Sequence, residues 1–133
     1  MITKIKISGF KTFRDFEMQF SPFTVIVGIN ASGKSNLFDA LQLLARLAES
    51  DLKTAFSEQR GEAIELFTQY GEDWYADEID FMVEMLIDRQ IRDNWGGEAE
   101  LKYTRLRYEL KIQRRQNERN LEDLFVASEK LEP

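Results

Sequence analysis

One short segment constrains this chain more than any other. Residues 28–35 read Gly-Ile-Asn-Ala-Ser-Gly-Lys-Ser, a complete match to the pattern G-x-x-x-x-G-K-[ST]. This pattern forms a phosphate-binding loop when it joins a buried strand to a helix. The apolar, β-branched run at 23–27 predicts that strand, and apolar residues at helical spacing between Leu37 and Ala48 predict a helix over 34–50. A glycine turn preceding a helix by chance would lack this context, so the segment predicts a phosphate-binding loop.

The residues of this loop have separate expected roles. Gly28 and Gly33 allow backbone angles that a Cβ would forbid, so that successive N–H groups point into one concavity. The helix that follows adds the partial positive charge of its N-terminus. Lys34 is expected to reach the β- and γ-phosphates, and the Ser35 hydroxyl to ligate Mg²⁺. The other residues expected to contact a nucleotide are Asn30, Ala31, Ser32 and Asn36.

Composition limits the chemistry that this chain can perform. The 133 residues include no cysteine and no histidine, which excludes disulfides, Cys/His zinc sites and histidine-based acid–base catalysis. No apolar run approaches the length of a membrane span, and no signal-peptide pattern opens the chain. We therefore expect a cytoplasmic protein with no membrane partner. The net charge of −6 argues against a protein that coats nucleic acid through its overall field.

Two charged segments allow alternative interpretations. Residues 102–119 carry seven Lys or Arg against two Glu, as a phosphate-contacting surface would, but the solvent side of an antiparallel strand pair has the same composition. We favour the strand pair. Residues 72–80 carry five carboxylates, whose irregular spacing favours a solvated loop over a cation site, with Trp74 and Tyr75 anchoring it in the core.

Hydrophobic periodicity predicts many strands and one main helix. Apolar and polar residues alternate over 1–10, 13–20 and 105–112, and the apolar composition of 79–87 and 124–127 predicts two more strands. Residues 51–76 have no clear period: Ile64-Glu-Leu-Phe fits a short strand or a helical turn, and Gly71 marks a turn. Even alternation of strands and helices, which a regular parallel sheet requires, is absent. The predicted fold class is α/β, in the form of an α+β lobe: a mixed sheet with antiparallel strands and a helix after the phosphate loop.

At this level of detail the chain resembles a known group. The segments Ile5-Lys-Ile-Ser-Gly-Phe-Lys-Thr-Phe-Arg-Asp-Phe and 20–41 resemble the N-terminus of ABC-type ATPases of the SMC/RecF class. The similarity is strongest to the bacterial "AAA family ATPase" proteins, including those allied to OLD-type nucleases and phage-defence systems. Lys34-Ser-Asn-Leu followed by Asp39-Ala-Leu is the most specific part, and 106–112 and 126–131 resemble antiparallel strands of the same proteins.

The resemblance implies a P-loop NTPase lobe that binds ATP with Mg²⁺. In such heads the turn after the first strand lies against the nucleotide base and ribose, and Lys11 and Thr12 occupy the matching positions. An ordinary exposed turn is the alternative for these two residues. Full proteins of this kind dimerise around two ATP molecules and use closure to control DNA engagement or an attached effector. A second copy, a C-terminal half and DNA are therefore the expected partners.

The resemblance also identifies motifs that this sequence lacks. Such ATPases need a Walker B aspartate with a catalytic glutamate, a signature loop and a switch histidine, all in the C-terminal half of the head. We find none of them, and therefore expect no catalytic residue in this chain. Residues 1–133 are expected to be an N-terminal lobe, with strands, loop and helix in 1–50, mainly antiparallel strands and loops in 51–133, and the C-terminal lobe absent. ATPase activity would belong to the full-length context, with little or none in this chain alone.

Asp88 is the one candidate for a Walker B residue within the chain. It follows Met85-Leu-Ile, but Glu84 interrupts the apolar run and Arg89 occupies the position of the catalytic base. We therefore expect Asp88 to be a turn residue at a strand end.

Three functions remain open from the sequence. The first is the ATP–Mg²⁺ lobe of an SMC/RecF-like ATPase in DNA repair or maintenance, or in phage defence. The second is a short nucleotide-binding regulatory subunit that a partner chain completes. The third is a small stand-alone NTPase that uses Asp88.

Overall fold

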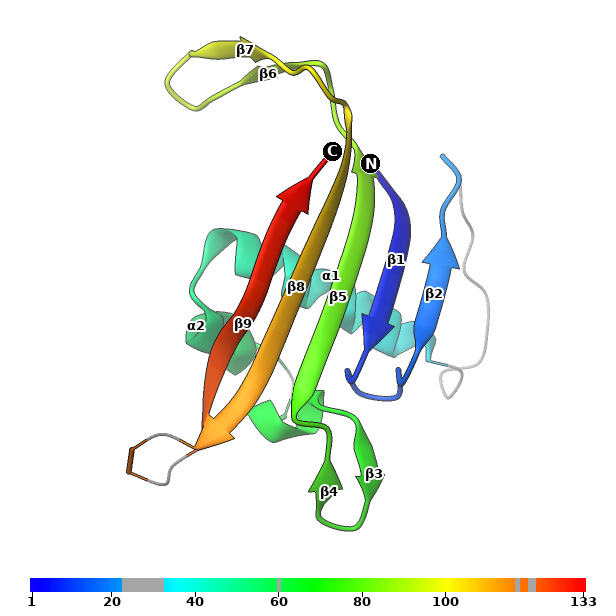
Figure 1. Cartoon of the computed structure of the whole chain (residues 1–133), viewed down its shortest axis with the longest axis vertical. Helices are drawn as coiled ribbons and strands as arrows, with labels where there is room; N and C mark the ends of the chain where they lie inside the picture. Colours follow the sequence, from blue (N-terminus) through cyan, green and yellow to red (C-terminus); the bar gives the residue numbers. More distant parts are fainter. Residues whose placement is uncertain (23–32, 60, 117, 120–121) are drawn as a thin grey trace.

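The computed structural model describes residues 1–22, 33–59, 61–116, 118–119 and 122–133. Its main element is a five-stranded sheet in the order β2-β1-β5-β8-β9, in which every neighbouring pair is antiparallel. The strands are β1 Ile2–Ser8, β2 Phe16–Gln19, β5 Glu78–Leu86, β8 Arg105–Gln116 and β9 Glu122–Glu132. The helices α1 (Lys34–Glu49) and α2 (Leu52–Ser57) lie against one face of this sheet (Figure 1).

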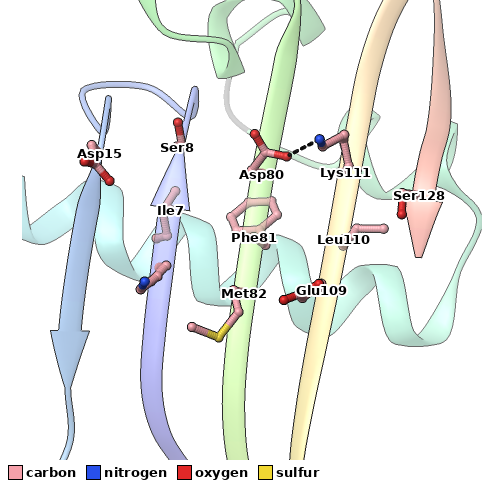
Figure 2. A pocket seen from close by; sticks show the side chains of 11 residues that line it. Ile7, Ser8, Asp15, Asp80, Phe81, Met82, Glu109, Leu110, Lys111 and Ser128 are labelled. Carbon is pink, nitrogen blue, oxygen red and sulfur yellow. Dashed lines mark ion pairs between the residues drawn. The ribbon is translucent and has the colours of Figure 1, made fainter. Parts of the chain in front are cut away.

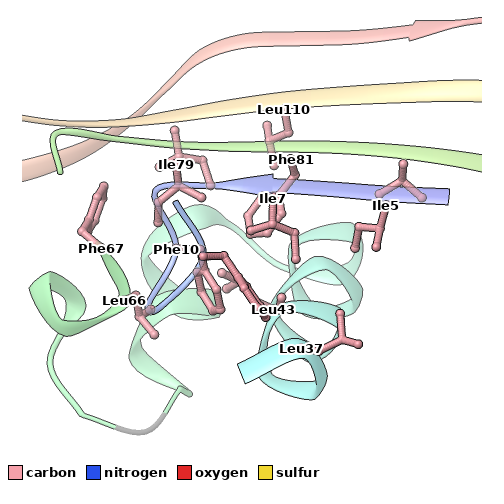
Figure 3. Close-up of a cluster of buried hydrophobic side chains, with 14 of the residues drawn as sticks. Ile5, Ile7, Phe10, Leu37, Leu43, Leu66, Phe67, Ile79, Phe81 and Leu110 are labelled. Carbon is pink, nitrogen blue, oxygen red and sulfur yellow. The ribbon is translucent and has the colours of Figure 1, made fainter. Parts of the chain in front are cut away.

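The alternating sequence explains why this face of the sheet is buried. Successive strand residues point to opposite faces, so Ile5 and Ile7 of β1 lie on the same side as Phe81 of β5. These side chains are at most 2% exposed, and they meet α1 through residues such as Leu43, as Figure 3 shows. Each such side chain contributes about 1.5–3 kcal/mol on burial. The apolar stripe of α1 therefore holds the helix across the sheet.

Smaller elements fill the connections. A 3-10 helix, Ala63–Leu66, precedes the hairpin formed by β3 (Gln69–Gly71) and β4 (Trp74–Tyr75). A second hairpin, β6 (Gln90–Arg92) and β7 (Glu98–Glu100), extends beyond the sheet (Figure 1). No helix in the described part of the chain is both long and apolar enough to cross a bilayer.

The strand and helix predictions are confirmed with modest changes in their bounds. The predicted strand over 13–20 is shorter, because Phe13 belongs to the turn that precedes β2. The part of the sheet that is described is wholly antiparallel, and the parallel strand predicted at 23–27 lies outside the described residues. Residues 51–76 contain α2, the 3-10 helix and the β3–β4 hairpin. The 3-10 helix confirms the helical turn at Ile64-Glu-Leu-Phe over the short strand, and the hairpin turns after Gly71 as predicted, whereas α2 and β4 were not predicted.

The prediction that Trp74 anchors its loop in the core is wrong. Its side chain is 67% exposed and packs against the ring of Tyr70, with ring centroids 5.3 Å apart. Tyr75, its neighbour, does pack against the core, as predicted. The physical reason is that adjacent residues of a strand point to opposite sides, so only one of the two aromatic rings can face inward.

Candidate nucleotide-binding site

The start of α1 follows a glycine with a left-handed backbone conformation. Gly33 is the N-cap residue, and its φ of 89° lies in the left-handed region that side chains disfavour. A Cβ at Gly33 would meet the Phe13 ring at 3.5 Å, an ordinary contact, so the need for glycine here comes from conformation more than from space. The carbonyl of Gly33 accepts the first helical hydrogen bond, from the Leu37 N–H at 3.0 Å.

The first turn of α1 leaves its positive end without a protein counter-charge among the described residues. Among the residues that the structure describes, no side chain caps the helix, and its first turn contains no Asp or Glu. Lys34, Ser35 and Asn36 occupy this turn, and each is partly exposed. An uncapped helix N-terminus with a lysine beside it favours an anionic ligand, because N–H groups and the helix dipole point the same way.

A tight turn between β1 and β2 lies directly beside this helix end. The turn spans Gly9–Phe13 and is closed by two backbone hydrogen bonds of 2.8 Å, from Gly9 N–H to the Phe13 carbonyl and from Phe13 N–H to the Phe10 carbonyl. Lys11 within it has a φ of 47°, rare for a residue with a side chain. The Lys11 N–H donates to the Leu66 carbonyl at 2.8 Å, which joins the turn to the 3-10 helix.

Two side-chain contacts join this turn to α1. The Asn36 amide donates to the Thr12 hydroxyl at 2.8 Å, and the Lys11 ammonium lies 2.7 Å from a carboxylate oxygen of Asp39. The side chains of Lys11 and Asp39 are only 16% and 14% exposed. Because Asn36 and Asp39 are three residues apart, they lie on one face of α1 and can reach the same turn. The predicted nucleoside-contact residues thus lie against the predicted phosphate-contact residues.

Thr12 also borders a surface cavity of about 640 Å³. Its lining residues are Lys11, Thr12, Arg14, Glu65, Phe67, Thr68, Gln69 and Tyr75. The Arg14 guanidinium lies 5.0 Å from the centre of the Tyr70 ring, and places a cation at the cavity beside the β3–β4 hairpin. The cavity therefore adjoins α1 through Lys11 and Thr12, and the Thr12 hydroxyl would lie 3.8 Å from a Cβ at position 33.

The structure thus brings six of the predicted site residues together. They are Gly33, Lys34, Ser35 and Asn36 on α1, and Lys11 and Thr12 on the turn. The remaining predicted residues lie outside the described part of the chain: Gly28, Asn30, Ala31 and Ser32. Sequence reasoning missed Asp39, although its spacing from Asn36 on the predicted helix was a usable signal.

A protein-family model for the AAA ATPase domain matches residues 1–130 of this chain. The chain belongs to this family. It is 38% identical over 64 residues to the DNA replication and repair protein RecF of Synechococcus sp., a match that covers 44% of this chain and 17% of that protein. It is 46% identical over 44 residues to RecF of Gloeothece citriformis, covering 32% of this chain and 12% of that protein. The matched part therefore spans less than a fifth of either relative.

A solved structure has a fold similar to that of this AAA ATPase domain. It comes from work on the structural biochemistry of ATP-driven dimerization and DNA stimulated activation of SMC ATPases. The TM-score is 0.56 with 20% sequence identity, over 95% of this chain and 69% of that one. The family match and these relatives confirm the resemblance to the N-terminal region of an SMC/RecF-like ATPase head.

Asp88 of this AAA ATPase domain lies far from the helix end. It is exposed and follows the last residue of β5. The register pairs Ser8 with Asp80, and the Leu86 N–H donates to the Met1 carbonyl, so Asp88 lies beyond the end of the sheet opposite to Gly9–Phe13. At about 3.3 Å per strand residue, the two ends are about 20 Å apart. This placement agrees with the prediction that Asp88 is a turn residue at a strand end. It argues against a small NTPase that uses Asp88 as its Walker B residue.

The outer face of the sheet contains a second hollow, of about 360 Å³ (Figure 2). Within it Lys111 lies 3.7 Å from Asp80, and 3.3 Å from Glu78 beside it. Burial and the nearby charge of Glu78 raise the pKa of Asp80, whereas a hydrogen bond from Gln113 lowers the pKa of Glu78. The carboxylates here outnumber the cations, and the face turns away from α1, so the hollow does not fit a polyphosphate.

The basic segment 102–119 is paired in the same way. Arg107 donates to Glu84 at 2.9 Å, and this bond lowers the pKa of the Glu84 carboxyl. Arg114 pairs with Asp77 at 3.2 Å and with Glu122. Since carboxylates on β5 and β9 neutralise these guanidinium groups, the structure favours the strand-pair interpretation over a phosphate-contacting surface.

Proposed function

We propose that this domain is the ATP-binding N-terminal lobe of an SMC/RecF-like ATPase head. The observation that carries the proposal is the first turn of α1, which presents Lys34 and Ser35 on a helix end that no side chain in the described part of the chain caps. A polyphosphate fits this end, because the helix dipole and the lysine both attract negative charge. The Gly9–Phe13 turn holds the helix end from the side through Thr12.

In this proposal different residues contact different parts of the nucleotide. Lys34 would bind the β- and γ-phosphates, and the Ser35 hydroxyl would be a ligand to Mg²⁺. Bound Mg²⁺ would supply neutralising charge on the phosphate oxygens. The nucleoside extends toward Thr12 and the adjoining cavity, whose polar lining suits a ribose.

Hydrolysis requires groups that we propose come from elsewhere. The described residues place no carboxylate at the start of α1 that could position a water, and Asp39 is held by Lys11. A C-terminal half and a second head would complete the site on dimerisation. The RecF relatives, named for DNA replication and repair, support a role in DNA repair or maintenance. A role in phage defence rests on the sequence resemblance alone.

Calorimetric titration with ATP and Mg²⁺ tests the binding site. We expect the wild-type chain to bind and Lys34→Ala to lose at least about tenfold in affinity, because a charge-assisted contact contributes about 1.5–3 kcal/mol. Lys53→Ala is the matched control, since this lysine is 76% exposed on α2 and has one long contact with Asp123, at 3.5 Å. Circular dichroism confirms that each variant is folded.

The outcomes separate the proposal from its competitors. A wild-type chain that does not bind ATP, or a Lys34→Ala variant that binds like wild type, would contradict it. Binding by all forms except Lys34→Ala supports it. A regulatory subunit would show the same binding, and co-purification with a separate chain that carries the missing motifs would identify that alternative.

A further inference from the structure

The contact between Lys11 and Asp39 differs from what a nucleotide-contacting lysine would show. The ammonium lies 2.7 Å from the carboxylate, and both side chains are mostly buried between the turn and α1. Asp39 follows Ser35 by one helical turn, so it lies on the body of the helix, behind the end that would meet phosphate. The charge of Lys11 is therefore directed toward the protein.

The backbone at Lys11 indicates that the turn is held in place. A left-handed φ of 47° costs conformational free energy in any residue other than glycine, and it persists only where the surroundings hold it. Three contacts do so here: the Lys11 N–H to the Leu66 carbonyl, the Lys11–Asp39 ion pair, and the Thr12–Asn36 hydrogen bond. Two of these three come from α1.

The two contacts with α1 fall on successive parts of the helix. Asn36 lies in the first turn and Asp39 in the second, so the pair defines both the position and the direction of the helix relative to Gly9–Phe13. Removing Lys11 or Asp39 would break the ion pair between two mostly buried side chains, and the turn would then lose one of its two side-chain contacts with the helix.

We infer that Lys11 and Asp39 are positioning residues for the phosphate site: their ion pair holds the Gly9–Phe13 turn against α1 and so aligns the helix end. The inference rests on the proposed function. It differs from the expectation that Lys11 contacts the base and ribose. Both Lys11 and Thr12 line the adjoining cavity, but the Lys11 ammonium lies against Asp39 of α1.

Affinities for two ligands separate positioning from nucleoside contact. ATP and inorganic tripolyphosphate, each with Mg²⁺, are titrated into wild type, Lys11→Met, Asp39→Asn and the double variant, well below each melting temperature. We expect each single variant to lose about three- to tenfold for both ligands, because the aligned helix end is common to both. The double variant should be no weaker than the weaker single variant, since both changes break one interaction.

The matched control is Lys6→Met, which removes an exposed ion pair with Glu17 on the other face of the sheet. It should leave both affinities unchanged. An exchange of charges, Lys11→Asp with Asp39→Lys, should recover part of the loss.

Other results would overturn the inference. If Lys11→Met weakens ATP and leaves tripolyphosphate unchanged, Lys11 contacts the nucleoside. If Asp39→Asn binds both ligands like wild type, the ion pair does not position the site. Additive losses in the double variant would also contradict a shared role. Failure of the proposed function is distinguishable, because wild type would then bind neither ligand and Lys34→Ala would change nothing.

Discussion

The two ends of the sheet differ in how closely their connections pack. At one end, here called the turn end, Gly9–Phe13 exchanges backbone hydrogen bonds of 2.8 Å with Leu66 and Thr68 and carries two side-chain contacts with α1. At the other, the arm end, the β6–β7 hairpin projects from the sheet (Figure 1). All six of its strand residues are exposed, and Trp95 between the strands is 91% exposed.

This difference shows where the fold concentrates its constraints. A binding site needs side chains held by packing and by neighbouring hydrogen bonds, and the turn end has both. A two-stranded hairpin without a hydrophobic face is marginally stable by itself, so the arm contributes little to the rest of the domain. Matched substitutions at the two ends measure the contrast, since the same chemical change should have unequal effects on the free energy of unfolding.

The largest contrast is expected for aromatic truncation. Phe10→Ala should lower the free energy of unfolding by about 3–5 kcal/mol, because the ring is fully buried against Phe81 and its loss leaves a cavity. Trp95→Ala at the arm end should change it by less than about 0.5 kcal/mol. Urea unfolding followed by circular dichroism measures both values. Similar losses at the two positions would refute the distinction between the ends.

Two glycines with positive φ provide the next test. A Cβ at Gly9 (φ 77°) would lie 2.0 Å from the Glu78 carbonyl oxygen, so Gly9→Ala should cost about 3 kcal/mol through backbone strain and displacement of β5. Gly96 (φ 85°) has nothing within 4 Å of the same position. Gly96→Ala should therefore cost only about 1 kcal/mol. Equal costs, measured by thermal and urea unfolding, would mean that φ alone sets the penalty.

The smallest contrast concerns two arginines. Arg114 at the turn end is 14% exposed, pairs with Asp77 and Glu122, and lies 5.6 Å from the Phe67 ring centre. Arg114→Met should cost about 1–2 kcal/mol. Arg92 in the arm pairs with Glu98 while 71% exposed, so Arg92→Met should cost less than about 0.5 kcal/mol. An Arg92 effect as large as that of Arg114 would show that the arm is coupled to the sheet.

Prediction from sequence succeeded where one periodic pattern spans a whole element. The alternation in β1, β5 and β8 and the helical spacing in α1 are long enough to identify each element. Within residues 51–76 it found the helical turn near Ile64 but missed α2 and β4, because α2 has six residues and β4 has two, too few for periodicity to appear. The exposed Trp74 belongs to the same region, where residue type suggested burial and the local backbone decided otherwise.

The candidate site divides in the same way. Gly33, Lys34 and Ser35 were predicted from one motif, because a phosphate loop and the helix after it are local in sequence. The contact of Lys11 with Asp39 was not predicted, because the two residues are 28 positions apart and meet only when α1 packs across the sheet.

By itself the sequence determined the kinds of elements, the family and the chemistry of the α1 end, because these depend on neighbouring residues. Only the tertiary structure decided the strand order, in which β5 separates β1 from β8, and the placement of Asp88 at the far end of the sheet. It also decided that the Lys11 ammonium lies against Asp39 of α1. Contacts between distant segments depend on how whole elements pack, and no local pattern encodes that packing.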